Sequence, residues 1–209
     1  AMDVTRALDQ EFIKLQRQGQ LALYPSCRGQ EAAQVGAGFA LEPSDWMFPQ
    51  YRELGTWVAR GVDPVGIGCM WRGTWHGGAG LLERNSAPIS IPIGTHALHA
   101  VGYALGAKFD HDPIVTVAFV GDGATSEGDV HEALNFAAVL EAPCVFFVQN
   151  NGWAISVPAA RQSKAPTLAH KAIGYGMPGV RCDGNDVLAC YMVMREAAER
   201  ARRGGGPTL

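Results

Sequence analysis

Residues 114–120 read Ile-Val-Thr-Val-Ala-Phe-Val, and residues 144–148 read Cys-Val-Phe-Phe-Val. Unbroken apolar runs of this length are typical of strands that are buried on both faces. Between them, residues 129–140 place Val130, Leu134 and Ala138 on one side of a predicted helix. Strand, helix and strand in this order predict a parallel sheet whose crossover connections are right-handed.

The rest of the chain adds helices, loops and one further strand to this unit. We predict a third strand around Val180, and helices at residues 5–18, 28–40, 51–61, 95–108, 167–175 and 186–203. Residues 43–50 predict a turn-rich loop. Residues 71–92 lack periodicity, so this long segment is either a functional loop or disordered. The length suits one α/β domain over residues 1–209.

Composition excludes several classes of protein. The chain is 47% hydrophobic and only 18% charged, which excludes intrinsic disorder and predicts that part of the surface faces a partner. The net charge of −3, with one small basic cluster at residues 200–203, argues against nucleic-acid binding. No apolar run reaches the roughly 18 residues of a membrane span, and the start does not read as a signal peptide. Five scattered cysteines without a CxxC pair predict reduced thiols in a cytoplasmic protein.

Polar residues follow both predicted strands. Gly121-Asp122-Gly123-Ala124 comes after the first strand, and Asn150-Asn151-Gly152-Trp153 comes after the second. In an open parallel sheet, ligands bind beyond the carboxyl ends of the strands, so Asp122 and Asn151 are expected to lie side by side. Carboxylate and amide oxygens suit Mg²⁺, which also takes phosphate oxygens. Each motif by itself is a common turn or loop, but together they predict a magnesium–diphosphate pocket.

This arrangement resembles the cofactor signature of thiamine-diphosphate enzymes, which opens with Gly-Asp-Gly and closes with Asn-Asn. Further blocks, in family order across nearly the whole chain, are similar to the alpha subunit of 2-oxo acid dehydrogenase complexes: Cys27 to Ala32, Tyr51-Arg52-Glu53, Pro92 to Thr95, Gly121 to Asn135, Asn150 to Pro158 and Asp183 to Val187. The motifs Asp-Gly-Asn-Asp-Val and Glu-Gly-Asp-x-His favour the branched-chain enzymes, because pyruvate enzymes usually carry methionine at the position of Asn185. The pyruvate type remains the alternative.

The resemblance implies a fold and a set of site residues. The fold is a three-layer, parallel-sheet thiamine-diphosphate-binding α/β fold, C-terminally truncated here, since the family continues with a strand and a histidine-bearing loop. Mg²⁺ is then held by Asp122, Asn151 and the carbonyl of Trp153. The cofactor-binding residues implied are Tyr51, Arg52, Ile91, Ile93, Gly121, Asp122, Gly123, Ala124, Asn151, Trp153 and Ile155. No catalytic residue is assigned, because the family's catalytic glutamate lies on the beta subunit.

The resemblance also implies an activity and partners. The activity is oxidative decarboxylation of a branched-chain 2-oxo acid, dependent on thiamine diphosphate and Mg²⁺, with acyl transfer to a lipoyl carrier. The partners are a beta subunit, in an assembly of two alpha and two beta chains, and a lipoyl-bearing acyltransferase. The chain alone is expected to be inactive.

Three features leave alternatives open. Gln149 stands where some branched-chain relatives carry an arginine near the diphosphate. Ser90, Pro92 and Thr95 correspond to a potassium site in some relatives, but His96 replaces the expected glutamine, which puts that ion in doubt. The rival functions are a dinucleotide-binding module, for which no GxGxxG follows a strand, and a non-catalytic fragment that only associates with other chains.

Overall fold

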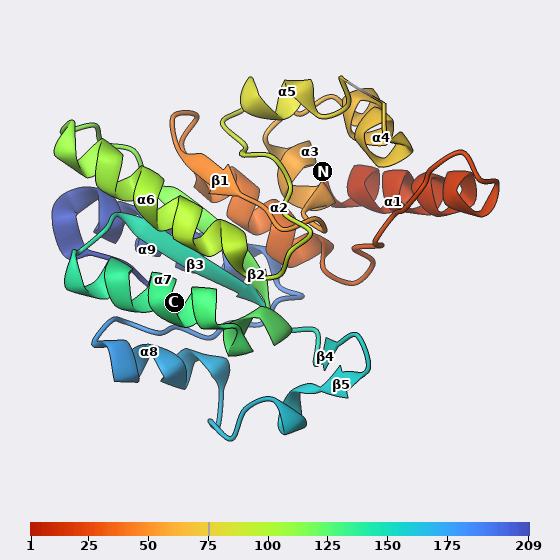
Figure 1. The fold of residues 1–209 in the computed structure, drawn as a ribbon. Coiled ribbons are helices and arrows are strands. Elements are labelled where there is room, and N and C mark those ends of the chain that lie inside the picture. Colours follow the sequence, from red (N-terminus) through yellow and green to blue (C-terminus); the bar gives the residue numbers. More distant parts are fainter. Residues whose placement is uncertain (75) are drawn as a thin grey trace.

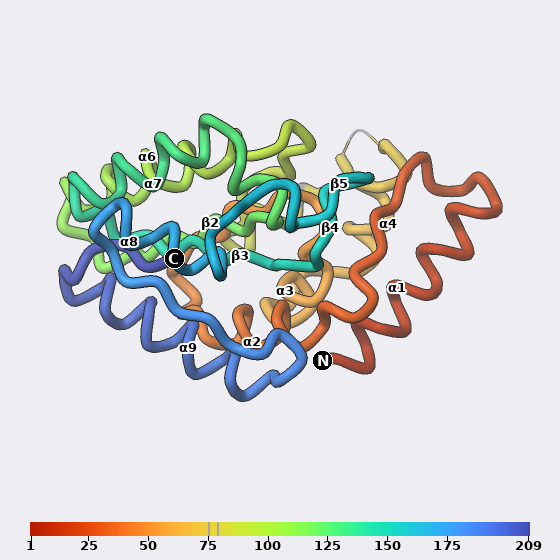
Figure 2. Tube along the Cα trace, turned by 90° about the horizontal axis from the view of Figure 1, so that it is seen from below, coloured from red at the N-terminus to blue at the C-terminus, as the bar shows by residue number. Residues whose placement is uncertain are grey.

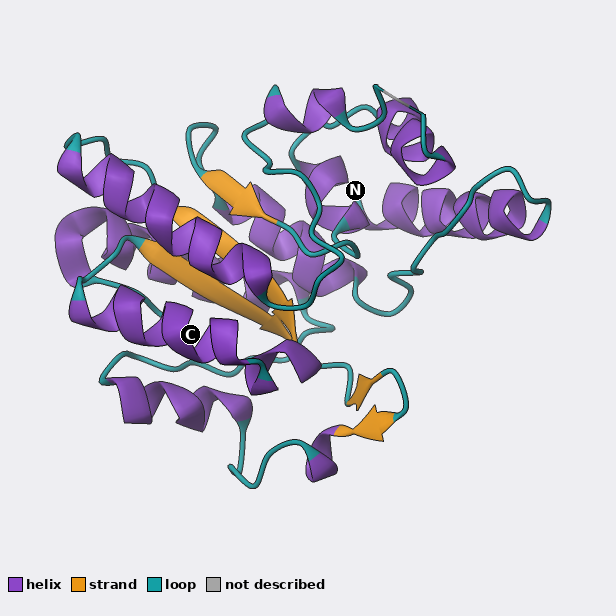
Figure 3. Cartoon of the chain, in the orientation of Figure 1, coloured by secondary structure: helices purple, strands orange, loops and turns teal. Residues whose placement is uncertain are grey.

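A parallel three-stranded sheet lies at the centre of the computed structural model, which describes residues 1–74 and 76–209 (Figure 1). The strands are β1 (Trp46–Phe48), β2 (Thr116–Gly121) and β3 (Cys144–Gln149), in the order β1-β2-β3. β2 pairs in parallel with both neighbours, so their carboxyl ends point to one side (Figure 3). On the other edge of β3, Thr208 forms a parallel bridge with Val145.

Helices cover both faces of this sheet, which gives the three predicted layers (Figure 2). Along β2, Val117 and Phe119 enter one apolar core, whereas Ala118 and Val120 enter the other, because successive side chains of a strand point to opposite faces. The first core lies against α1 (Met2–Arg17), α2 (Glu31–Ala40), α3 (Leu54–Ala59), α4 (Pro64–Arg72) and α9 (Val187–Arg200). The second lies against α6 (Thr95–Phe109), α7 (Gly128–Val139) and α8 (Lys171–Tyr175).

Shorter elements complete the described chain. Helix α5 spans Ala79–Leu82, and a small antiparallel hairpin is formed by β4 (Trp153–Ala154) and β5 (Val157–Pro158). Single helical turns lie at Gly123–Ser126, Ala159–Arg161, Leu168–His170 and Ala201–Gly205. None of the helices in the described ranges combines the length and apolar character that crossing a bilayer requires.

Small residues allow α2 and α9 to pack closely. A Cβ added at Gly36 would lie 2.8 Å from the carbonyl oxygen of Val187 and 2.9 Å from the Cβ of Cys190. A Cβ added at Gly38 would lie 2.7 Å from the Cβ of Ala59 in α3. The glycines of α2 therefore fix the layer of helices on this face of the sheet.

Three sequence predictions about elements are wrong. Residues 43–50 include β1, a three-residue strand too short to show a pattern, which exists because it pairs with β2. Val180 is not in a strand: its N–H donates to Leu209 O at 2.9 Å. Residues 71–92 contain α5 and the end of α4, and position 75 in this segment lies outside the described residues. Two helices also begin three residues later than predicted: α2 begins at Glu31 and α3 begins at Leu54.

A buried ion pair joins Asp45, which precedes β1, to Arg202 in the helical turn that follows α9. The fully buried carboxylate of Asp45 accepts hydrogen bonds from Arg202 at 3.0 and 2.8 Å. The same carboxylate accepts from the backbone N–H groups of Glu42 and Val115. Asp45 therefore organises the entrance to both β1 and β2.

We expect Arg202→Ala to lower the free energy of unfolding by about 3–5 kcal/mol, because it leaves the Asp45 charge buried and unpaired. The matched control is Arg203→Ala, since Arg203 is 79% exposed and pairs with Glu199 on the surface. Arg203→Ala should lower the free energy of unfolding by less than about 1 kcal/mol. Urea unfolding measures both values, and equal losses would contradict the role given to Asp45.

Candidate functional site

The ends of β2 and β3 bring the two predicted polar clusters together. Gly121 pairs with Gln149 in the parallel register, so Asp122 follows the end of β2 and Asn150 and Asn151 follow the end of β3. Asp122 is almost fully buried, whereas Asn151 is exposed. The structure thus places a carboxylate and an amide at one edge of the sheet.

The turn after β2 is held on both sides. Asp122 O accepts hydrogen bonds from Thr125 N at 3.2 Å and Thr125 Oγ1 at 2.8 Å, which close the helical turn at Gly123–Ser126. Lys171 Nζ in turn donates to Thr125 O at 2.6 Å, and burial lowers the pKa of this lysine. The Asp122 carboxylate accepts from Gln162 Nε2 at 3.3 Å. Residues of three segments therefore fix the position of Asp122.

Gly123 is required for the close approach of the β4–β5 hairpin. A Cβ added at this position would lie 2.5 Å from the Cβ of Ala154. Among the described residues, no hydrogen bond uses the N–H groups of Gly123 and Ala124. Two N–H donors at the start of a helical turn, beside a glycine, form a suitable cradle for phosphate oxygens.

The loop after β3 orients its own backbone. Asn150 Oδ1 accepts from Gly152 N and Asn151 Oδ1 accepts from Trp153 N, each at 3.0 Å. Gly152 has φ +84°, a left-handed conformation that glycine adopts without strain. These local turns fix the peptide groups that lead into Trp153, the first residue of β4.

The apolar residues implied as cofactor contacts are exposed. Ile91 and Ile93 lie in the segment before α6 and are 49% and 39% exposed. Trp153 is 58% exposed, and Ile155 at the tip of the hairpin is fully exposed. Ile155 has φ +56°, which is strained for a β-branched residue. Such strain persists only where the surrounding structure enforces it, and it is concentrated at functional sites.

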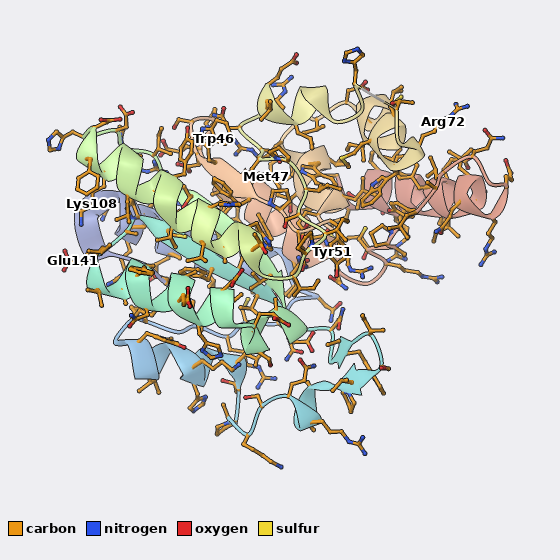
Figure 4. All side chains as sticks on the ribbon, in the orientation of Figure 1. Trp46, Met47, Tyr51, Arg72, Lys108 and Glu141 are labelled. Atoms are coloured by element: carbon orange, nitrogen blue, oxygen red, sulfur yellow. The ribbon has the colours of Figure 1, made fainter. Side chains whose placement is uncertain are left out.

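Tyr51 and Arg52 follow β1 and lie on the side to which the strands point, where Figure 4 labels Tyr51. The Arg52 guanidinium carbon is 5.6 Å from the centre of the Tyr51 ring. The same guanidinium donates to the carbonyl oxygen of Ser26. The arginine is thus held at the sheet edge by a neutral acceptor, which a phosphate anion can replace with a stronger, charge-assisted bond.

Buried side chains hold the backbone of Arg52 from both sides. Arg52 N donates to Glu53 Oε2 and Arg52 O accepts from Gln34 Nε2, each at 2.9 Å. Gln149 links these partners, because its amide donates to Glu53 Oε1 at 3.0 Å and accepts from Gln34 Nε2 at 2.9 Å. Glu53 is fully buried, and burial raises its pKa to about 7. The network joins α2, β3 and the start of α3 beneath Arg52.

The profile of one protein family, described as the dehydrogenase E1 component, matches residues 1–209. The chain belongs to this family. It is 67% identical over 208 residues to the 3-methyl-2-oxobutanoate dehydrogenase subunit alpha of Mycobacterium tuberculosis, an alignment that covers 100% of this chain and 57% of that protein. It is 42% identical to the pyruvate dehydrogenase E1 component subunit alpha of Acholeplasma laidlawii, covering 98% and 59%. The chain therefore spans less than two thirds of these relatives.

A solved structure supports the same fold for this dehydrogenase E1 chain. It is an X-ray structure of a protein from Mycobacterium smegmatis assigned to the thiamin diphosphate-dependent enzymes, with a TM-score of 0.55 and 20% identity. The match covers 90% of this chain and 31% of that one. The predicted three-layer α/β fold of thiamine-diphosphate enzymes is confirmed, and the likeness at this identity concerns the fold alone.

The sequence did not single out several residues that shape the site of this dehydrogenase E1 chain. Gln34 and Glu53 hold Arg52, Gln162 contacts Asp122, and Lys171 fixes the turn that follows. The one signal was Gln149, where the change from arginine leaves an amide that reaches Glu53. The contacts of Gln34, Gln162 and Lys171 join segments that are far apart in the sequence, so no local pattern indicates them.

Among the described residues, no histidine belongs to a cluster suited to metal binding. No group of three or more His, Cys, Asp or Glu side chains is placed for metal binding in the described part of the chain. His96 is buried and its Nε2 donates to Phe119 O at 2.6 Å, and burial lowers its pKa. Ser90 donates to Pro92 O, and Thr95 donates to Asp129. Ser90, Pro92 and Thr95, the residues that the resemblance relates to a potassium ion, are thus engaged in contacts within the chain.

We expect Glu53→Gln to weaken the pH dependence of stability. The raised pKa means that the folded state binds a proton more tightly than the unfolded state, whose ordinary value is 4.5. This contribution to stability is present below pH 4.5 and is lost as the pH rises through about 7. Urea unfolding between pH 4.5 and 7.5 should show a smaller decrease of the free energy of unfolding with pH for Glu53→Gln than for the wild type. Glu132→Gln, at an exposed position, should keep the wild-type pH dependence.

Proposed function

We propose that this chain is the cofactor-binding part of the alpha subunit of a branched-chain 2-oxo acid dehydrogenase. The observation that carries the proposal is the pairing of Gly121 with Gln149, because Asp122 and Asn151 follow these two paired strand ends. Membership of the dehydrogenase E1 family supports it. So does the 67% identity to a 3-methyl-2-oxobutanoate dehydrogenase subunit alpha.

The residues present fit a magnesium–diphosphate group. Carboxylate, amide and backbone carbonyl oxygens form the hard donor set that Mg²⁺ prefers, and we assign them to Asp122, Asn151 and Trp153. The diphosphate would be held by Tyr51, Arg52 and the glycine turn at 121–124. The exposed apolar side chains of Ile91, Ile93 and Ile155 would contact the organic rings.

When bound, thiamine diphosphate supplies the electron sink for decarboxylation of a 2-oxo acid. This chain's own residues bind and orient. Asp122 presents its charge from a buried position that few waters reach, so its attraction for a cation is only weakly screened. Arg52 presents a planar fork of donors that matches two phosphate oxygens. The buried contacts of Gln34 and Glu53 keep that fork at the edge of the sheet.

We further propose that the site is completed by a beta subunit, in an assembly of two alpha and two beta chains in the cytoplasm. A lipoyl-bearing acyltransferase would accept the acyl group. The exposure of Trp153 and Ile155 on the β4–β5 hairpin supports a partner surface there, because neighbouring exposed apolar side chains mark interaction sites. No turnover is expected from the chain without its partner.

The test is calorimetry of the alpha–beta complex with thiamine diphosphate in the presence of MgCl₂. We expect saturable binding that EDTA abolishes. Binding of NAD in place of thiamine diphosphate would overturn the proposal in favour of a dinucleotide module. If the complex forms but binds no cofactor, the chain serves association alone.

The substrate class is tested by kinetics of the same complex. We expect kcat/KM for 3-methyl-2-oxobutanoate to exceed that for pyruvate by at least about tenfold, the scale on which a pocket distinguishes substrates by added methyl groups. The pyruvate type is the second candidate, since a pyruvate dehydrogenase E1 subunit alpha is 42% identical. A preference for pyruvate would establish it.

A further inference from the structure

Two cysteine thiols that have no part in the proposed diphosphate site lie in contact with each other. Cys182 is in the segment between α8 and α9, and Cys190 is on α9. Their Sγ atoms are 3.9 Å apart, and the Cys190 thiol lies 3.4 Å from the carbonyl oxygen of Asp183. Within the described residues this is the one contact between two thiols. All five cysteines are free thiols in this structure.

We propose that Cys182 and Cys190 form an oxidisable dithiol, which oxidants of the hydroperoxide class convert into an intramolecular disulfide. A disulfide requires an S–S distance of about 2.05 Å, so the two sulfurs must approach by roughly 2 Å. Cys182 lies outside any helix or strand, so an approach of its sulfur to Cys190 does not require a helix or strand to break. Cys190 is held in place, because α2 packs against its Cβ at Gly36.

Exposure decides which sulfur reacts first. Cys190 is only 1% exposed, and burial raises its pKa to about 12, so its thiol stays protonated at neutral pH. Cys182 is half-buried and therefore more accessible to a small oxidant. Both cysteines line a cavity of about 1060 Å³, through which a peroxide molecule can reach the more exposed Cys182. Cys182 is therefore the site of the first attack.

The reaction balances with one peroxide for each pair of thiols. The Cys182 sulfur, having lost its proton, attacks a peroxide oxygen; an S–O bond forms, the O–O bond breaks, and hydroxide leaves to take up a proton as water. The Cys190 sulfur then attacks the sulfenic sulfur of Cys182 and gives up its proton. The S–S bond forms as the S–O bond breaks, and the second water leaves. Two thiols are oxidised and the peroxide is reduced.

The consequence is a covalent link across the start of α9. The bond would close the segment 183–189, which contains Asp186, the residue whose carboxylate caps α9 by accepting from Leu188 N and Ala189 N. Asn150 and Asn151 line the same cavity as the two cysteines. The proposal stands on the thiol geometry and does not depend on which cofactor the chain binds.

The experiment treats the full chain with hydrogen peroxide, denatures it, and labels the remaining thiols with N-ethylmaleimide. We expect the mass to fall by two hydrogens, about 2 Da, with labels falling from five to three and returning after reduction. Peptide mapping should show Cys182 linked to Cys190. Five labels after peroxide, stable over-oxidation without a link, or a link between other cysteines would each overturn the proposal.

Single substitutions separate this pair from general thiol oxidation. Cys182→Ser, at a half-buried position, should keep all four remaining labels after peroxide. Cys190→Ser should gain oxygen on Cys182 without forming a disulfide. The control is Cys69→Ser, which removes a partly exposed cysteine on α4 and should still lose two labels. Loss of two labels in Cys182→Ser would contradict the assignment.

Discussion

Replacing Asp122 with alanine is expected to abolish magnesium-dependent binding of thiamine diphosphate to the alpha–beta complex. Asp122 is the one charged side chain of the proposed donor set, and it is 2% exposed. Residues that merely support a metal ligand contribute about 10–100-fold to metal affinity, so loss of the ligand should exceed about 100-fold. Asp122→Asn should lose nearly as much, because it keeps the shape and removes the charge.

Calorimetry with thiamine diphosphate and MgCl₂ measures the affinity, and thermal unfolding checks that each variant is folded. Asp112→Ala is the matched control. Asp112 is an exposed residue that precedes β2, so it lies at the opposite end of the strand that Asp122 follows. The Asp112→Ala complex should bind thiamine diphosphate with the affinity of the wild type. Wild-type affinity in a folded Asp122→Ala complex would overturn the proposed metal site.

The second large effect is expected for Arg52→Ala, which should weaken diphosphate binding by about 10- to 150-fold. A hydrogen bond to a charged partner contributes about 1.5–3 kcal/mol, which corresponds to that range. The fold should persist, because Gln34 and Glu53 contact the backbone of Arg52 rather than its side chain. The affinity of Arg52→Lys should fall between those of the wild type and Arg52→Ala, since lysine keeps the positive charge and loses the planar fork of donors.

Calorimetry with thiamine diphosphate again gives the affinities, and inorganic pyrophosphate serves as a second ligand. If Arg52 contacts the diphosphate, both ligands should lose affinity by similar factors. The control is Arg72→Ala, at an exposed position on α4 that Figure 4 shows far from Tyr51. A change for thiamine diphosphate but not for pyrophosphate would place Arg52 near the rings instead.

The sequence by itself determined the central strands, the turns after them and the family. β2 and β3 are unbroken apolar runs because both faces of each strand are buried, and that condition is visible locally. The positions of Asp122 and Asn151 followed from parallel topology, since the carboxyl ends of such strands share one edge. Their ligand roles remain predictions.

Only the tertiary structure decided the features that join distant segments. β1 has three residues and exists through its pairing with β2. The segment around Val180 was predicted as a strand, but among the described residues Val180 makes only one backbone hydrogen bond, to Leu209. The contacts of Arg202 with Asp45 and of Gln149 with Glu53 span 157 and 96 residues. Buried polar groups need hydrogen-bond partners, and the tertiary fold supplies these from distant segments, so no local sequence pattern predicts these pairs.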